Sequence, residues 1–422
     1  MNILLTPLTS SSIAHTIRAL ELADRLTEKG EKVYFTSCTL KKDFIESNGY
    51  EVIKSYTPFN LNDKDDQSVN YLASHKQEMM EWFKADIDAA KEVKADVVVT
   101  SPGILGPHVT HATGIPTIAL LNGQYVQGSK GLIGLSLSSD KLIDVIVRTI
   151  LRPIFNYMTV KLYSSEVLDA YHKLGFGFNL KKRKDVYEPM HVLIPGDEEF
   201  EPQRYLDEKT RFVGPLFWKG FETINGDLTD GALRRFKGEK KMVFLNFGGS
   251  VFDIKTYKSI INELEKINAK KIVALGPNFE RENFPKDTED MIIRKYVPGL
   301  RVSSIADLIV NTGSQGAIMQ ALMYGKPVIA FPVGIDQSFY SNRLEEMGLG
   351  KNINKSNIFN FTKRESYQLL DNNIPKKIVV AVNEVLKNDI YTQNVIEYSK
   401  RLKSRYLDPA GEILSYIYDT IK

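Results

Sequence analysis

The sequence predicts an α/β protein with two doubly wound parallel sheets, because two strand–helix–strand segments occur in a chain long enough for two domains. Between residues 307 and 331, a short apolar strand, a helix with a buried stripe and a second apolar strand follow one another. The same order opens the chain between residues 2 and 37. Strand, helix and strand within about thirty residues predict a parallel βαβ unit. Each half of the chain is therefore expected to begin a nucleotide-binding-like domain.

Hydrophobic spacing places the first elements. Residues 2–6 predict a buried strand, a helix follows over residues 13–29 and ends at Gly30, and residues 32–37 predict the next strand. His15 stands at the start of this helix, above the carboxyl edge of the sheet, where a residue meets ligand. Imidazole suits a general base because its pKa lies near working pH. Capping or solvation is the alternative role for a single histidine.

A long helix is predicted over residues 71–93, with its apolar side toward a core. Asp86 and Asp88 within it have a spacing that occurs in metal sites, but both carboxylates are expected mid-helix on a mostly polar face. We therefore interpret this pair as solvated surface. Residues 96–99 predict the next strand.

In the C-terminal half, residues 242–247, 272–275 and 291–296 predict further strands. Gly248-Gly249-Ser250 follows the first of them. Glycines let a backbone approach a diphosphate and Ser250 adds a hydroxyl donor, although the same pattern is common in ordinary turns.

The βαβ unit between residues 307 and 331 predicts a ligand site at the carboxyl ends of its strands. One loop, residues 312–316, runs into a helix start, where unpaired N–H groups and the helix dipole attract an anion such as a phosphate. The second loop, residues 334–337, places the carboxylate of Asp336 and the amide of Gln337 beside it. Together they suit a phosphate that carries a hydroxyl-rich group. A plain βαβ unit whose loops bind nothing is the alternative.

Composition narrows the class of protein. The chain has 422 residues with 43% hydrophobic content, which we interpret as two domains. A net charge of +3, from 55 basic and 52 acidic residues, gives no electrostatic case for a nucleic-acid partner. The basic run at residues 181–184 is interpreted as a solvated face, with contact to an anionic lipid surface or acceptor as the alternative.

Cysteine content and hydropathy predict a cytoplasmic protein. The single cysteine, Cys38, excludes an internal disulfide and a thiolate zinc cluster. No stretch approaches the roughly twenty apolar residues that span a bilayer. The first residues lack the basic start and the long apolar run of a signal peptide, so we expect them to form a buried strand.

Residues 296–350 resemble the nucleotide-sugar-binding motif of family 1 glycosyltransferases, the antibiotic and natural-product glucosyltransferases with the two-domain GT-B fold. That family has His-Gly-Gly-x-Asn-Ser-x-x-Glu-Ala-Leu, then Gly-x-Pro and then Asp-Gln. The matching residues are Gly325, Pro327, Asp336 and Gln337. Four other motif positions differ from the family. Thr312 stands where the family has its phosphate-binding His, and Gln320 where it has its ribose-binding Glu. Gly316 and Ala317 stand where the family has Asn and Ser.

Further stretches resemble the same family. Gly248-Gly249-Ser250 matches its Ser-x-Gly-Ser or Ser-x-Gly-Thr loop. Tyr296-Val297-Pro298 falls on its Trp-x-Pro, whose indole stacks on the base and whose following backbone reads the base edge; a surface tyrosine is the alternative. His15 falls on the family's general base. The Asp that orients this base falls on Thr100, with Ser101 next to it, so a hydroxyl is the implied orienting group.

The resemblance also implies a domain organisation. An acceptor-binding domain is expected over residues 1–217, a linker over 218–241, a nucleotide-sugar-binding domain over 242–393 and a C-terminal helix over 394–422 that crosses back to the first domain. Residues 142–163 are apolar and aromatic and fall in the family's acceptor pocket, which implies an apolar acceptor. An ordinary buried helix pair is the alternative for that stretch.

The implied protein has two Rossmann-like domains that face each other across a cleft, and it is an inverting, metal-independent hexosyltransferase. His15 would take the proton of a small acceptor, and the donor would be a UDP- or dTDP-sugar, which is a substrate, so no cofactor is implied. The implied donor-binding residues are Gly248, Gly249, Ser250, Tyr296, Val297, Thr312, Gly313, Ser314, Gln315, Gly316, Gln320, Asp336 and Gln337. Because several motif positions differ from the family, two alternatives stay open: an inactive auxiliary protein of a glycosyltransferase, and a nucleotide-sugar epimerase.

Overall fold

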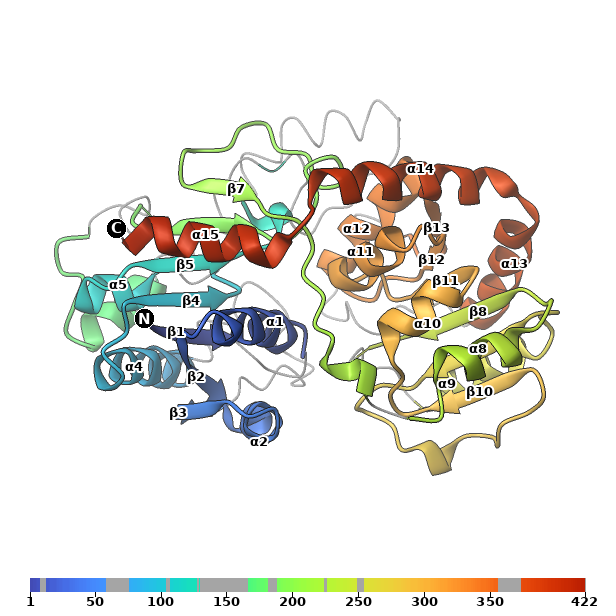
Figure 1. The fold of residues 1–422 in the computed structure, drawn as a ribbon, viewed down its shortest axis with the longest axis horizontal. Coiled ribbons are helices and arrows are strands. Elements are labelled where there is room, and N and C mark those ends of the chain that lie inside the picture. Colours follow the sequence, from blue (N-terminus) through green and yellow to red (C-terminus); the bar gives the residue numbers. More distant parts are fainter. Residues whose placement is uncertain are drawn as a thin grey trace. The chain divides into compact units, whose positions relative to one another are not determined.

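The computed structural model describes residues 1–7, 13–57, 76–103, 107–126, 129, 166–180, 188–223, 226–248, 254–355 and 373–421. The chain divides into two compact units. Unit 1 comprises Met1–Leu132, Ser139–Trp218 and Asp408–Lys422, and unit 2 comprises Ile133–Ser138 and Lys219–Leu407. Each unit is an α/β fold in its own right (Figure 1).

The described residues of unit 1 form a seven-stranded sheet with the order β3-β2-β1-β4-β5-β6-β7, in which all neighbouring strands are parallel. The strands are β1 (Asn2–Pro7), β2 (Lys32–Cys38), β3 (Glu51–Tyr56), β4 (Val97–Ser101), β5 (Thr117–Leu120), β6 (His191–Ile194) and β7 (Thr210–Phe212). The order runs outward in one direction from β1 and in the other from β4. The topological switch point, where such sheets bind ligands, therefore lies between β1 and β4.

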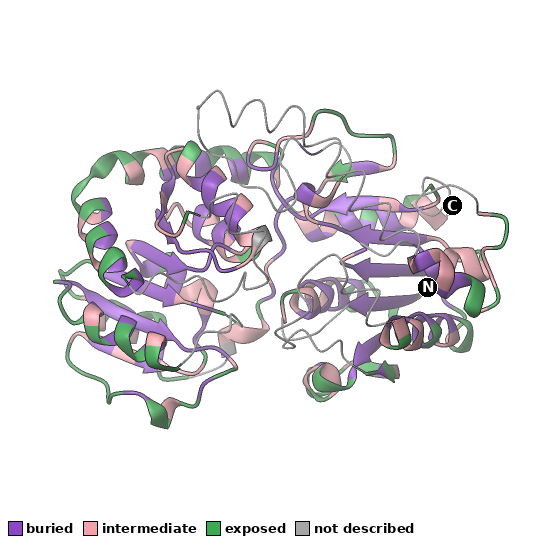
Figure 2. Cartoon of the chain, turned by 180° about the vertical axis from the view of Figure 1, so that it is seen from behind, coloured by how far each residue is buried: buried purple, intermediate pink, exposed green. Residues whose placement is uncertain are grey.

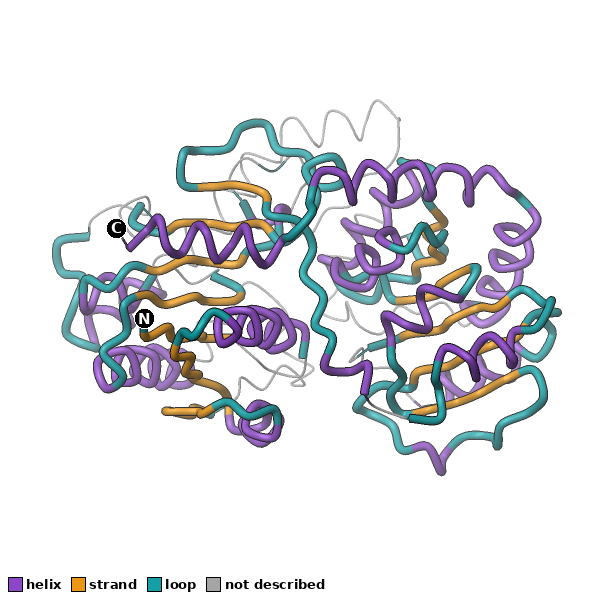
Figure 3. The backbone as a smooth tube through the Cα atoms, in the orientation of Figure 1, coloured by secondary structure: helices purple, strands orange, loops and turns teal. Residues whose placement is uncertain are grey.

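The helices of unit 1 cover both faces of this sheet. They are α1 (Ala14–Glu28), α2 (Thr39–Ser47), α4 (Lys76–Glu92), α5 (His108–Thr113), the 3-10 turn η1 (Gly123–Tyr125) and α15 (Pro409–Ile421). Helix α1 contacts α2 and α15, and α4 contacts α5, so helices pack on one another as well as on the strands (Figure 3). Ion pairing between Arg25 and Asp408, at 2.7 Å, ties the start of α15 to α1.

The described residues of unit 2 form a six-stranded parallel sheet with the order β10-β9-β8-β11-β12-β13. Its strands are β8 (Met242–Asn246), β9 (Lys270–Ala274), β10 (Met291–Arg294), β11 (Leu308–Asn311), β12 (Val328–Ala330) and β13 (Gly350–Asn352). Its helices are η2 (Gly220–Thr223), α8 (Asp230–Lys237), α9 (Ile254–Leu264), η3 (Arg281–Asn283), α10 (Gly299–Ile305), α11 (Gln315–Met323), α12 (Ile335–Glu346), α13 (Ile374–Lys387) and α14 (Asp389–Arg405). The switch point of this sheet lies between β8 and β11.

The strands of both sheets are buried, and the outer sides of the helices are exposed (Figure 2). In unit 2, the ring of Phe247 packs edge-on against Tyr257 and Phe331, with centroids 4.7 Å and 5.2 Å away. In unit 1, Trp82 and Phe83 of α4 are buried, so this helix packs its apolar side into a core as predicted. These apolar cores hold the carboxyl ends of the strands in fixed register.

The predicted βαβ unit between residues 307 and 331 is confirmed as β11, α11 and β12. The predicted linker over residues 218–241 contains η2 and α8, and from Lys219 onward it belongs to unit 2. The tail forms two helices, because α14 ends at Arg405 and Pro409 begins α15. Within the described ranges, we find no helix with both the length and the apolar character needed to cross a membrane.

The interpretation of Asp86 and Asp88 as one solvated face is wrong. Asp86 is fully buried, where its carboxylate accepts a hydrogen bond from the Thr36 hydroxyl and lies 2.9 Å from Nε2 of His108. Asp88 is partly exposed and pairs with Lys84. Residues two apart on a helix do not share a face, since each residue turns the chain by about 100°.

Candidate active site

His15 lies at the switch point of unit 1. Helix α1 begins at Ala14, so His15 is in its first turn, and Ser101 is the last residue of β4. Because β1 and β4 are parallel, with Pro7 opposite Ser101, both side chains stand at the carboxyl edge of the sheet. Nδ1 of His15 is 3.0 Å from Oγ of Ser101. This contact orients the imidazole ring.

Of the two hydroxyls predicted to orient His15, only that of Ser101 contacts it. The Thr100 hydroxyl donates instead to the carbonyl of Thr6, at 3.3 Å. Successive residues of a strand point to opposite faces, so the two hydroxyls cannot serve the same ring. In the described part of the chain, no carboxylate hydrogen-bonds to His15.

Arg18, one turn after His15, is a neighbour that the sequence interpretation missed. Its side chain is buried, and Nη1 donates to Oδ1 of Asn122, at 2.9 Å. Burial and the nearby Arg18 charge together lower the pKa of His15 to about 3. The imidazole is therefore neutral at physiological pH and carries a lone pair that can accept a proton. The sequence signal for the proximity of His15 and Arg18 was their i, i+3 spacing on the predicted helix.

The depressed pKa of His15 predicts an acid-sensitive stability. In the unfolded chain His15 has a pKa of about 6.5, so between that pH and the folded pKa of about 3 the unfolded state binds more protons. Stability should accordingly fall as pH decreases through this window, and His15→Ala should flatten the fall. NMR titration should show no protonation of the His15 ring between pH 8 and pH 5. A titration midpoint near 6.5 would contradict the desolvated environment.

The predicted phosphate loop lies at the switch point of unit 2. It follows β11 and leads into α11, whose N-cap residue, Ser314, makes no side-chain capping hydrogen bond. Gly313 has φ of +82°, and a Cβ there would lie 2.1 Å from Oγ of Ser341 on α12. Only glycine allows this loop to lie against α12. Thr312 and Gln315 are buried, with 3% and 4% of their surface exposed, whereas Gly316 is exposed.

A second glycine loop lies beside it at the end of β8. Gly248 has φ of +58°, and a Cβ on Gly276 would meet the Gly248 carbonyl oxygen at 2.0 Å. Gly276 follows β9. The sequence interpretation did not include it in the site, and the only signal for it was a glycine directly after a predicted strand. Gly249 and Ser250, also predicted to bind the donor, lie outside the described residues.

Asp336 and Gln337 occupy the first turn of α12. Gln337 Oε1 accepts hydrogen bonds from the backbone N–H groups of Val333 and Gly334, at 2.9 Å and 3.2 Å, so it caps its own helix. Burial raises the pKa of the Asp336 carboxyl group. A Cβ on Gly313 would lie 3.1 Å from the Gln337 carbonyl oxygen, so the structure brings the two predicted ligand loops together.

Gln320 makes contacts that the resemblance does not imply. Its Nε2 donates to the Gly299 carbonyl, at 2.9 Å, and to Oγ of Ser303, at 2.8 Å. Both partners belong to α10, so this amide joins α11 to α10. Its two N–H donors are used within the protein, and Oε1 is the atom with acceptor capacity for a ligand.

Gln320→Glu should destabilise unit 2, although it restores the residue that the family carries. A carboxylate has no hydrogen to donate to Gly299 and would place its charge against a carbonyl oxygen. We expect a loss of about 1–3 kcal/mol, measured as a lower thermal midpoint by circular dichroism. Gln320→Ala is the control, since it removes the same bonds without adding a charge and should lose less. A Gln320→Glu protein as stable as wild type that binds UDP more tightly would contradict this role.

Tyr296 and Val297 follow β10. Tyr296 is 37% exposed, and its ring is nearly parallel to that of Phe221, with 6.4 Å between centroids and 10° between planes. Val297 is buried. Phe221 lies in η2, within the stretch predicted as a linker, and hydrophobic spacing gave no reason to single it out.

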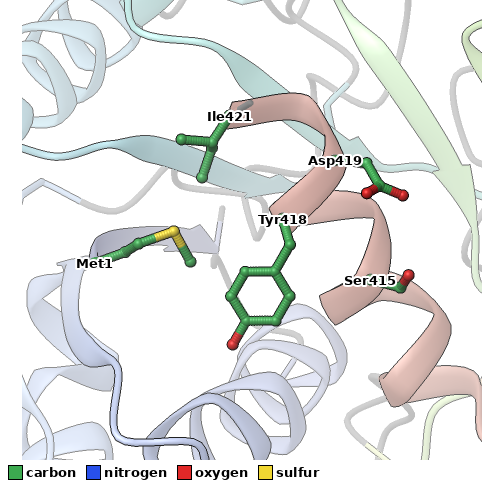
Figure 4. A pocket seen from close by; sticks show the side chains of 5 residues that line it. All are labelled: Met1, Ser415, Tyr418, Asp419 and Ile421. Atoms are coloured by element: carbon green, nitrogen blue, oxygen red, sulfur yellow. The ribbon is translucent and has the colours of Figure 1, made fainter.

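A surface pocket elsewhere contains none of the predicted site residues. It is lined by Met1, Ser415, Tyr418, Asp419 and Ile421, between the start of β1 and α15 (Figure 4). This is the amino end of β1, opposite the edge that carries His15. Among the described residues, no group of three or more His, Cys, Asp or Glu side chains could hold a metal ion.

Two parallel doubly wound sheets with these switch points define the GT-B fold, and solved structures agree. The calicheamicin glycosyltransferase CalG4 matches with a TM-score of 0.68 and 16% identity over 100% of this chain and 99% of that chain. The glycosyltransferase SnogD from Streptomyces nogalater matches with a TM-score of 0.70 and 13% identity over 100% of both chains. VinC, solved in complex with dTDP, matches with a TM-score of 0.65 and 14% identity over 100% of this chain and 99% of that chain.

Sequence relatives confirm the resemblance to family 1 glycosyltransferases. The uncharacterized UDP-glucosyltransferase YdhE of Bacillus subtilis is 26% identical over 48% of this chain and 47% of its own length. The NDP-glycosyltransferase YjiC of Bacillus subtilis is 23% identical over 84% of this chain and 85% of its own length. The chain spans about half the length of the first curated relatives that it matches: 47% of YdhE and 58% of YojK, the uncharacterized UDP-glucosyltransferase of the same organism. No protein-family model matches the chain.

Proposed function

We propose that the protein is a glycosyltransferase that moves a sugar from a nucleoside-diphosphate donor to a small acceptor. The observation that carries the proposal is the glycine loop at the switch point of unit 2, where Gly313 brings the start of α11 against α12. The names of the sequence relatives support the same activity. UDP- and dTDP-sugars are the proposed donors, because relatives are named for UDP and a structural neighbour holds dTDP.

The start of α11 holds the diphosphate in this proposal. Its first backbone N–H groups and the positive end of the helix dipole attract the anion. As the bond between sugar and diphosphate breaks, negative charge grows on the leaving oxygen, and preorganised donors lower the barrier most at that moment. Asp336, in the first turn of α12, is the proposed partner for sugar hydroxyls.

His15 acts on the acceptor. The acceptor oxygen attacks the anomeric carbon, its proton passes to the His15 imidazole, and the bonding electrons leave with the diphosphate. This single displacement inverts the anomeric centre. Ser101 holds the ring through Nδ1, which directs Nε2 toward the proton.

Other parts of the proposal come from the sequence. An apolar acceptor is proposed from residues 142–163, which lie outside the described residues. Independence of metal ions and a cytoplasmic location are proposed from the family resemblance and from the single cysteine, Cys38.

The decisive experiment incubates purified protein with UDP- and dTDP-sugars and a panel of phenolic, terpenoid and polyketide acceptors. Mass spectrometry should detect glycosylated product, release of the nucleoside diphosphate should match it, and excess EDTA should leave the rate unchanged. Proton NMR of the product should show the inverted anomer. The proposal would be wrong if the protein showed neither transfer nor hydrolysis and if calorimetry detected no binding of UDP or dTDP at millimolar concentration.

One observation favours an inactive auxiliary protein as the second candidate. His15 contacts a hydroxyl and not a carboxylate, and a base with a pKa of about 3 gains little from taking a proton. An auxiliary protein would bring about neither transfer nor hydrolysis in the same assay. Isomerised nucleotide sugar would identify the epimerase alternative.

A further inference from the structure

The rings of Phe221 and Tyr296 form an unusually spaced pair within unit 2. Their centroids are 6.4 Å apart with 10° between planes. The other stacked pairs among the described residues are closer, at 4.3 Å for Phe83 and His108 and 5.2 Å for His172 and Phe178. A planar ring lies about 3.5 Å from each ring that it stacks on, so two parallel rings hold a third when they are about 7 Å apart. The centroid distance of 6.4 Å is the upper limit of the gap between the planes of Phe221 and Tyr296, so a base enters between the two rings as they move apart by at least about 0.6 Å.

Glu222 ties the segment that carries Phe221 to the start of α10. Its carboxylate accepts hydrogen bonds from the backbone N–H groups of Leu300, at 2.9 Å, and Arg301, at 3.1 Å. These groups belong to the first turn of α10, which begins directly after Tyr296-Val297-Pro298. The residue next to Phe221 is thereby tied to the turn that carries Tyr296. A charged acceptor bound to two N–H groups is a strong anchor.

The same turn is linked to α11, the helix that follows the phosphate loop. Gln320 of α11 donates to the carbonyl of Gly299, the first residue of α10. Hydrogen bonds therefore connect the segment of Phe221 to α10, and α10 to α11, near the carboxyl edge of the unit 2 sheet. A ligand with its diphosphate at α11 would carry its base toward the rings.

We propose that Phe221 is the second wall of a nucleobase slot, with Tyr296 as the first, and that Glu222 positions it. This inference rests on the proposed function, since it names a residue that stacks on the base of the nucleotide donor. Stacking between two rings recognises any planar base and does not select one by hydrogen bonding. The slot should therefore accept both uracil and thymine.

The test compares a ligand with a base to one without. Isothermal titration of Phe221→Ala should weaken UDP binding roughly 5- to 150-fold, the usual effect of removing one stacked ring, and leave pyrophosphate binding unchanged. Glu222→Ala should weaken UDP in the same selective way, because the ring loses its anchor. Phe221→Tyr keeps a flat ring and should restore affinity. Phe178→Ala removes an exposed stacked ring in unit 1 and serves as the matched control, with no effect on UDP.

Saturation-transfer NMR on bound UDP gives a second readout. Transfer to the uracil H5 and H6 protons should fall in Phe221→Ala relative to transfer to the ribose protons. Equal weakening of UDP and pyrophosphate, or wild-type UDP affinity and uracil signals in Phe221→Ala, would overturn the slot while leaving the proposed function intact. A wild type that binds neither ligand would overturn the proposed function itself.

Discussion

His15→Ala should lower the rate of sugar transfer by about 100- to 10,000-fold and leave the affinity for UDP unchanged. The imidazole accepts a proton only as the acceptor attacks, so its loss affects the transition state and hardly affects donor binding. Its position at the switch point of unit 1, 3.0 Å from Ser101, is what qualifies it for that role. Steady-state kinetics with the best donor and acceptor, alongside calorimetry with UDP, measure both quantities.

Two control variants separate catalysis from orientation. Ser101→Ala removes the hydroxyl that orients the ring but keeps the base, so its loss of rate should be much smaller than that of His15→Ala. His172→Ala removes an exposed histidine of the same unit and should leave the rate unchanged. A His15→Ala enzyme that keeps more than half of the wild-type rate would remove His15 from the mechanism.

The sheets could be predicted because their strands are apolar runs with clear ends. Residues 307–310 and 328–331 needed only hydrophobicity, a turn-favouring segment and Gly325 to give β11, α11 and β12. The position of His15 at a sheet edge followed from the same logic, since a residue just after the first strand of a parallel sheet stands at its carboxyl end. Local signals were sufficient for both.

Side-chain contacts between distant segments could not be predicted in this way. Gln320 was assigned to ribose from a motif position, but its hydrogen bonds reach Gly299 and Ser303, about twenty residues earlier in the chain. Phe221 meets Tyr296 across a longer separation, and nothing in its own surroundings in the sequence marks it. Such pairs depend on how the elements pack, which periodicity does not specify.

The buried Asp86 is the clearest case of a residue whose role depends on packing. Its carboxylate has no exposed surface, and His108, with 3% exposed, and Thr36 surround it with hydrogen-bonding groups. Phe83 stacks on the His108 ring and Trp82 lies against its edge, which keeps water away. A carboxylate in such a place is tolerated only while its partners satisfy it.

Asp86→Ala should therefore destabilise unit 1 by about 1–3 kcal/mol for each donor left unsatisfied, because it leaves His108 and Thr36 buried without their acceptor. Asp88→Ala, two residues along the same helix, should change stability by no more than about 0.5 kcal/mol, since its pair with Lys84 is at the surface. Both tryptophans, Trp82 and Trp218, belong to unit 1, so urea unfolding followed by tryptophan fluorescence reports on this unit alone. A loss in Asp86→Ala as small as that in Asp88→Ala would mean that the contacts of Asp86 with His108 and Thr36 contribute nothing to the stability of unit 1.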